Sequence, residues 1–268
     1  MVKTRLSRGS KILLAVTGGL LVLVLWSLFV QSPESRRVLE EALPQPPAVW
    51  SSLPPPQPAE VAGFAVDIAL DPAGAVTPLS PATFAALAAL ERPLLIRLLP
   101  NQAASARPER DAQALTAWLR GLGLSRDPAV EIWVLAYDWP LLEALGRRDP
   151  DLTLAFGSLS ETVGRDRPGA SSWLGGRDLV AVEGSLPALV RQAGGRVWAP
   201  TLRELRPEDV ADARAAGIAT LVTDVSDPSV FESLLPLRPE GLITSRPAAL
   251  LEAIVAQSGL YAPGATTK

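Results

Sequence analysis

Short apolar runs recur along the chain from about residue 62 to its end. They are nearly continuous in Val, Ile, Leu and Ala rather than alternating with polar residues. That pattern is typical of strands that are covered on both faces in a parallel sheet. Eight runs are predicted as strands: 64–70, 94–99, 131–137, 152–156, 178–183, 196–200, 219–225 and 241–245.

Segments with helical spacing lie between most of these runs. The segment 80–91 begins with Ser80 as an N-cap and Pro81 at the first helical position, and segment 109–123 ends in glycine. Residues 157–176 carry no clear helical pattern and are predicted as a loop. Eight strands alternating with helices over about 200 residues favour a (β/α)8 TIM-type barrel, an α/β fold. An open doubly wound sheet is the alternative.

The N-terminal segment is predicted to be a membrane anchor. Residues 12–30 carry no charge, and at about 1.5 Å per residue they just span a hydrocarbon core about 30 Å thick. The preceding segment 1–11 is basic and carries no acid, so it is predicted to stay in the cytoplasm. A cleaved signal peptide is the alternative, but its apolar region is shorter, about 7–15 residues, and no clean Ala-x-Ala site follows here.

The rest of the chain is therefore predicted to be periplasmic or extracellular, attached to the inner (cytoplasmic) membrane by a single transmembrane helix. Residues 31–61 are rich in proline, which disfavours helix and central strand and favours extended polyproline II. They are predicted as a semi-rigid spacer. The barrel is expected over 62–260, followed by a tail at 261–268.

Composition excludes several kinds of site. The chain contains no cysteine and no histidine, so it has no thiol nucleophile, no disulfide, no Cys₂His₂ zinc site and no Ser-His-Asp triad. No cofactor is predicted; any metal would be a hard cation held by oxygens, Mg²⁺ or Ca²⁺. The net charge is −3 and no basic cluster alternates with aromatics, which argues against nucleic acid as a partner.

Several segments, taken in order, resemble a known family. They are GFAVDIALDPAGAV (63–76), RPLLIRLL (92–99), VEIWVLAYDWPLLEALGRRDPDLTLAF (130–156), AGGRVWAPT (193–201), GIATLVTDVSDP (217–228) and EGLITSRP (240–247). Their order and spacing resemble the glycerophosphodiester phosphodiesterases, which are phospholipase-C-like TIM barrels. The resemblance covers nearly the whole predicted barrel, although each piece by itself consists of a few common residues.

The resemblance implies a set of catalytic and metal-binding residues, and this chain lacks several of them. Family members use two histidines for proton transfer, an arginine for phosphate, and carboxylates from two strands for a divalent cation. Here Asp67 is the only retained family ligand, because the Glu of the Glu-x-Asp motif is Ala65. The Glu of the Ile-Glu-Ile-Lys strand is Arg97, a cation that would repel a metal ion.

The family's first strand should precede Gly63, where this chain has only the proline-rich segment. Closure of the barrel then needs a replacement strand. We expect the last unit, 241–245 with its helix, to fill the vacated place, so that Leu242 and Ile243 pair with the strand at 64–70. Pairing of a spacer residue at that place would refute the hypothesis.

Acids lie on or just beyond several predicted strand ends, the edge that faces the active side of this fold. They are Asp67, Asp71, Asp138, Glu183, Asp224 and Asp227. Asp67, Glu183 and Asp224 are the candidates for metal-assisted catalysis. The alternative is structural: these acids cap helices or pair with Arg97, Arg203 or Arg246.

The sequence predicts that the protein is a pseudoenzyme, which acts as a non-catalytic binding or scaffold module at the cell envelope. Its expected partners are the membrane, through residues 12–30, and envelope or membrane-complex proteins. The alternative is a divergent metal-dependent phosphodiester hydrolase that acts on glycerophosphodiesters or a related substrate. A salt bridge between Arg97 and the candidate acids would favour the inactive interpretation.

Overall fold

The fold is known from a computed structural model, which describes residues 47–52, 60–71, 75–77, 86–87, 89, 92–100, 103–121, 131–163 and 170–257. Within these ranges no helix combines the length and the apolar character that crossing a membrane requires. The predicted anchor at residues 12–30 and most of the predicted helix at 80–91 lie outside the described residues. Both therefore stay predictions.

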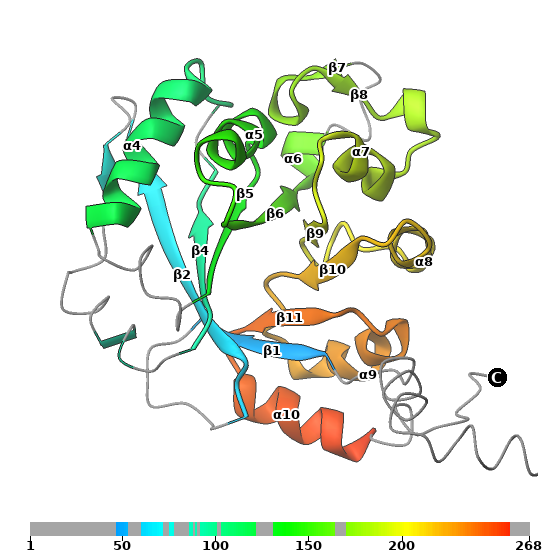
Figure 1. The fold of residues 1–268 in the computed structure, drawn as a ribbon. Helices are drawn as coiled ribbons and strands as arrows, with labels where there is room; N and C mark the ends of the chain where they lie inside the picture. The colour runs from blue at the N-terminus through cyan, green and yellow to red at the C-terminus, as the bar shows by residue number, and fades with distance from the viewer. Residues whose placement is uncertain are drawn as a thin grey trace, which may run out of the picture. The chain divides into compact units, whose positions relative to one another are not determined.

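Eight parallel strands form a closed barrel (Figure 1). They are β1 (Ala48–Ser51), β2 (Gly63–Leu70), β4 (Leu94–Leu98), β5 (Ile132–Ala136), β6 (Thr153–Ser158), β9 (Val197–Pro200), β10 (Ala219–Val222) and β11 (Gly241–Thr244). The order around the barrel is β1-β11-β10-β9-β6-β5-β4-β2, and the pairing of β1 with β2 closes it. The predicted barrel is confirmed, and the open sheet is excluded.

Among the described residues, three short strands lie outside the barrel. The two-residue strand β3 (Val76–Thr77) pairs antiparallel with the end of β2. Strands β7 (Ala170–Ser171) and β8 (Arg177–Asp178) form a separate two-stranded sheet.

Helices surround the barrel on its outside (Figure 1). The longer ones are α4 (Pro108–Gly121), α5 (Trp139–Arg148), α7 (Leu186–Gln192), α8 (Pro207–Ala215) and α10 (Pro247–Ala256). The short ones are α6 (Ser160–Val163), α9 (Phe231–Leu234), η2 (Ser172–Leu174), η3 (Val180–Val182), η4 (Pro228–Val230) and η5 (Leu235–Leu237). In the described residues of the predicted loop at 157–176, the elements beyond the end of β6 are α6, β7 and η2.

The closing strand comes from the segment predicted as a spacer. Strand β1 pairs with β11 over four residues, with Val49 opposite Leu242 and Trp50 opposite Ile243. On its other side, Trp50 pairs with Gly63 of β2. The hypothesis that Leu242 and Ile243 pair with the 64–70 strand is therefore wrong, and the barrel begins inside the range 31–61. The proline density concealed a short proline-free stretch, 48–53, whose Val and Trp suit a strand.

One predicted strand is absent from the barrel. Only Asp178 of the range 178–183 is in a strand, at the end of β8, and Val180–Val182 form η3. Val180 is 66% exposed, so this apolar run does not enter the core. The count of eight strands was right, but β6 pairs directly with β9 where the sequence placed 178–183, and β1 between β11 and β2 makes up the eighth strand.

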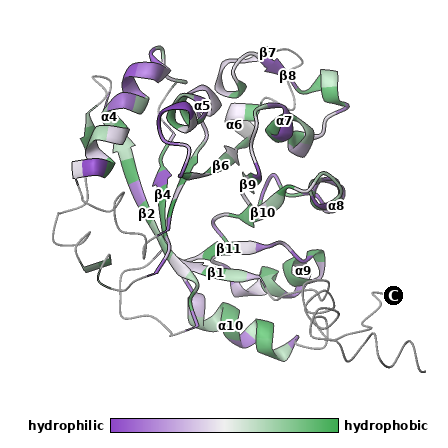
Figure 2. Ribbon diagram, in the orientation of Figure 1, coloured by the Kyte–Doolittle hydropathy of each residue, from purple (hydrophilic) through white to green (hydrophobic). Residues whose placement is uncertain are grey.

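The hydrophobic core has two layers separated by the barrel wall. Outward-facing strand residues such as Ile96 and Val134 pack against helix residues such as Leu115 and Leu142. Inward-facing residues fill the barrel, and they include Trp50, Ala65, Leu95, Leu135, Ala155, Leu221 and Ile243. Figure 2 shows hydrophobic colour over much of β2. Side chains alternate along a strand, so Asp67 lies on the same inner face as Ala65, and Arg97 on the same inner face as Leu95. Asp67 and Arg97 begin the polar layer at the C-terminal end of the barrel.

Replacing Trp50 with Ala tests the role of β1. The Trp50 side chain is buried, its ring lies 5.2 Å from that of Trp133, and Gly63 leaves room for it because a Cβ there would clash with the ring. We expect Trp50→Ala to lower the free energy of unfolding by about 3–5 kcal/mol, measured by urea denaturation. Val180→Ala, at an exposed position, should change it by less than about 0.5 kcal/mol. Equal effects of the two substitutions would show that β1 does not hold the barrel closed.

Candidate functional site

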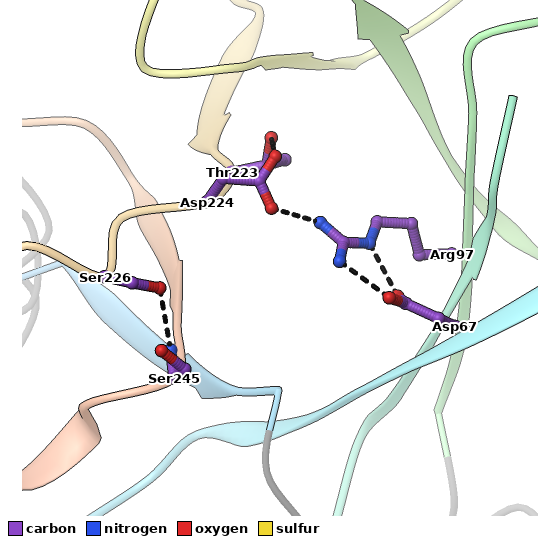
Figure 3. A network of polar contacts seen from close by, with 6 residues as sticks. All are labelled: Asp67, Arg97, Thr223, Asp224, Ser226 and Ser245. Carbon is purple, nitrogen blue, oxygen red and sulfur yellow. Dashed lines mark hydrogen bonds and ion pairs between the residues drawn. The ribbon is translucent and has the colours of Figure 1, made fainter.

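An ion pair joins two neighbouring strands at the C-terminal end of the barrel. Asp67 of β2 and Arg97 of β4 lie opposite each other in register. The Arg97 Nε donates to Asp67 Oδ1 at 2.6 Å, and Nη2 donates to Oδ2 at 2.8 Å (Figure 3). Two parallel hydrogen bonds between a guanidinium and a carboxylate give a strong and geometrically specific contact.

The same guanidinium reaches a second carboxylate from a more distant strand. Its Nη1 donates to Asp224 Oδ1 at 2.6 Å, and Asp224 follows the end of β10 (Figure 3). Strands β2 and β10 are separated in the barrel by β1 and β11, so the contact crosses the barrel mouth. The Arg97 side chain is 11% exposed, whereas those of Asp67 and Asp224 are 41% and 54% exposed. We call these three residues the Arg97 bridge.

Electrostatics hold Arg97 in its charged form. Burial works against the charged guanidinium, but the hydrogen bonds and negative charges of Asp67 and Asp224 outweigh it, so the pKa of Arg97 lies above its usual value. With two carboxylates and one guanidinium, the bridge carries a formal charge of −1. Its positive member is the least exposed of the three, and it lies between the two acids.

The backbone of Asp224 is left-handed, with φ of 60°, a conformation that Asp tolerates better than most residues. Thr223 and Tyr137, two residues that the sequence did not single out, support its side chain. The hydroxyl of Thr223 donates to Asp224 Oδ2 at 3.4 Å, and Tyr137 hydrogen bonds with Thr223. Burial raises the pKa of the Tyr137 phenol, although that hydrogen bond opposes the shift. Gly157 makes room for the Tyr137 ring, since a Cβ there would lie 2.7 Å from it.

The structure brings together only two of the three predicted catalytic acids. Asp67 and Asp224 meet through Arg97, whereas Glu183 ends η3 with φ of 55° and is exposed. Within the described part of the chain, no group of three or more acids is placed to hold a metal ion. The residues at the barrel mouth do not fit a divalent cation, because the Arg97 guanidinium lies between the two carboxylates that would bind it.

The other acids at the strand ends have structural roles, as the alternative interpretation expected. Asp138 is the N-cap of α5 and accepts from the Leu141 amide. Asp227 accepts from the Ser229 amide at the start of η4, and Asp71 accepts from the Ala75 amide in a turn. Each side chain thus satisfies a backbone donor that a turn or a helix start leaves open.

Comparisons with known proteins identify the fold. No family model and no curated protein matches the chain. Among solved structures, a putative glycerophosphoryl diester phosphodiesterase from Silicibacter pomeroyi matches with a TM-score of 0.58 and 19% identity, over 82% of this chain and 97% of that chain. A glycerophosphodiester phosphodiesterase from Parabacteroides distasonis matches with a TM-score of 0.55 and 11% identity, over 79% and 98%.

A third similar structure is an Oleispira antarctica phosphodiesterase in complex with its product, sn-glycerol-3-phosphate. It matches with a TM-score of 0.55 and 13% identity, over 81% of this chain and 98% of that chain. The coverage confirms that the resemblance extends over the whole barrel, and the low identities limit it to the fold. The chain therefore has the closed-barrel fold of the glycerophosphodiester phosphodiesterases.

Proposed function

We propose that this protein is a membrane-anchored, exported phosphodiesterase-like barrel that has lost its catalytic residues. In this proposal it acts as a non-catalytic binding or scaffold module at the cell envelope, alone or within a membrane complex. The observation that supports it best is the Arg97 bridge, in which a guanidinium lies between the two acids best placed for catalysis.

Loss of proton transfer supports the proposal. The chain has no histidine, so the groups that the resembled family uses as acid and base are missing. Asp67 and Asp224 both accept hydrogen bonds from the charged Arg97, so carboxylate oxygens that could face a substrate are already engaged. The phenol of Tyr137 is buried, and its raised pKa keeps it protonated at neutral pH.

Repulsion of a metal ion supports it as well. Two unit charges 4 Å apart interact by about 4 kcal/mol at an effective dielectric constant near 20, and a divalent ion doubles that value. A cation brought to Asp67 and Asp224 would meet this repulsion from Arg97. It would also have to displace three charge-assisted hydrogen bonds.

The envelope location rests on the sequence. The uncharged stretch 12–30 has the length of a membrane span, and its basic flank orients the chain with the N-terminus in the cytoplasm. A barrel held next to a membrane would meet lipid headgroups and membrane proteins at a high local concentration. Partners of these kinds are therefore part of the proposal.

A divergent metal-dependent phosphodiester hydrolase is the second candidate. The fold favours it, and the Oleispira antarctica phosphodiesterase of similar fold holds sn-glycerol-3-phosphate. This candidate needs the acids Asp67, Glu183 and Asp224 to act on a glycerophosphodiester or a related substrate. The two candidates differ in a measurable way, because only the hydrolase turns over substrate.

The first test is an assay of glycerophosphocholine hydrolysis by the full chain in millimolar Mg²⁺ or Ca²⁺. Hydrolysis is measured as the release of choline. We expect no turnover above a protein-free blank, and no change with Asp67→Asn. Metal-dependent turnover that Asp67→Asn abolishes would establish the hydrolase and overturn the proposal.

The second test concerns the structural role of the Arg97 bridge. Arg97→Met keeps much of the side-chain volume but removes three charge-assisted hydrogen bonds. Because both acids are about half exposed, water can solvate them in the variant, and we expect a loss of about 1–3 kcal/mol in the free energy of unfolding. The matched control, Arg203→Met, changes an exposed arginine and should cost less than about 0.5 kcal/mol. An equal loss in both variants would contradict a stabilising bridge.

A further inference from the structure

A cavity of about 730 Å³ lies beside the barrel mouth, on the outer side of the barrel wall. The last residues of three strands, Leu70, Leu98 and Ala136, line it, and all three belong to the outward-facing core. Leu98 follows Arg97 directly, and successive side chains point to opposite faces of a strand. Arg97, Asp67 and Asp224 do not line the cavity, whereas Tyr137, which hydrogen bonds with Thr223 next to Asp224, does. The cavity volume lies within the range of about 300–1,000 Å³ that is usual for small-molecule sites.

The buried polar groups of this cavity already have partners. Asp138 accepts from the amides of Leu141 and Ser105. Asp111 accepts from the hydroxyl of Ser105 and from Arg110, which lies 2.8 Å away. Burial raises the pKa of the Asp138 carboxyl, and the two amide hydrogen bonds oppose that shift without cancelling it. A ligand would therefore find few open hydrogen-bonding groups at the floor.

Apolar side chains offer the remaining contact surface. Leu98, Leu141 and the half-buried Trp173 line the cavity. Leu99 lines it too and is 42% exposed, which makes it one of three large, exposed hydrophobic side chains in the described part of the chain. Together, Leu98, Leu99 and Trp173 give the cavity an apolar wall that an apolar ligand group can cover.

One positive charge remains available at the rim. Of the two arginines that line the cavity, Arg110 pairs with Asp111, whereas Arg107 is exposed and makes no ion pair with any residue that the structure describes. The rim also carries Asp71, whose carboxylate accepts from the Ala75 amide. Arg107 is thus the group best able to hold a negatively charged ligand group, and guanidinium suits phosphate or carboxylate.

We propose that this cavity binds an amphiphile, with its apolar body against Leu98, Leu99 and Trp173 and its anionic head group on Arg107. The inference rests on the non-catalytic binding role proposed above and gives that role a ligand class and a site. The ligand can come from solution or from a lipid surface, since both present the same chemistry. The ligand lies against the outer side of the barrel wall, in a cavity that Arg97, Asp67 and Asp224 do not line.

The test is calorimetric titration of the full chain, held in phosphatidylcholine nanodiscs, with hexyl phosphate as a soluble probe. We expect one saturable site. Arg107→Glu should weaken binding at least tenfold, Arg107→Lys should retain most of it, and Leu99→Glu should weaken it several-fold. The control Arg203→Glu makes the same charge change at an exposed position that does not line the cavity and should leave affinity within twofold. Thermal melting of each variant shows that it is folded.

Three results would overturn the proposal: no binding of hexyl phosphate, equal binding of hexyltrimethylammonium, or equal losses in Arg107→Glu and Arg203→Glu. Titration with anionic vesicles separates the two sources of ligand. Binding to anionic vesicles but not to hexyl phosphate would indicate non-specific attraction of the protein to a charged surface. That result would also contradict binding in the cavity. Failure here leaves the hydrolysis test untouched, so loss of the cavity and loss of the non-catalytic role can be told apart.

Discussion

The partly buried guanidinium of Arg97, between the carboxylates of Asp67 and Asp224, decides what the barrel mouth can do. It neutralises half of the formal negative charge of these two acids, at the place where this fold gathers its strand ends. It also fixes the positions of the two acids, one on the neighbouring strand and one across the mouth. A single cationic side chain thus takes the central position that a divalent ion would need.

This interaction depends on the closure of the barrel. Strand β1 contributes four residues, yet it links β11 to β2 and thereby sets the separation between β10 and β2. Trp50 fills the barrel interior below the polar layer and contacts Trp133. If β1 left its place, β2 and β11 would become open edges, and the distance that Arg97 spans to Asp224 would no longer be fixed.

Much of the fold could be predicted from local pattern, because strands covered on both faces are continuously apolar. That signal identified β2, β4, β5, β6, β9, β10 and β11. It missed β1, which is short and lies between prolines, and it wrongly assigned 178–183, whose Val180 points to solvent. Both errors have one cause: whether an apolar run becomes a strand depends on partners distant in sequence, which a local pattern does not report.

The site was predictable to a lesser degree. The pairing of Asp67 with Arg97 follows from two neighbouring strands, and the sequence named Arg97 as a potential partner of the acids. The left-handed backbone of Asp224 and its support by Thr223 and Tyr137 depend on how β5 and β10 meet across the closed barrel. Glu183 was misplaced because its supposed strand is a turn of 3₁₀ helix.

Calcium titration of the full chain and of its Arg97→Gln variant tests the central claim most directly. The variant removes the charge and shortens the side chain, which leaves Asp67 and Asp224 facing an open position. Our account predicts no saturable Ca²⁺ site in the natural chain and a weak one in the variant, with a Kd of about 10⁻⁴–10⁻³ M. Arg97→Lys, which keeps the charge, should behave like the natural chain. Equal Ca²⁺ affinity in the natural chain and in Arg97→Gln would contradict the claim that Arg97 holds the place of a metal ion.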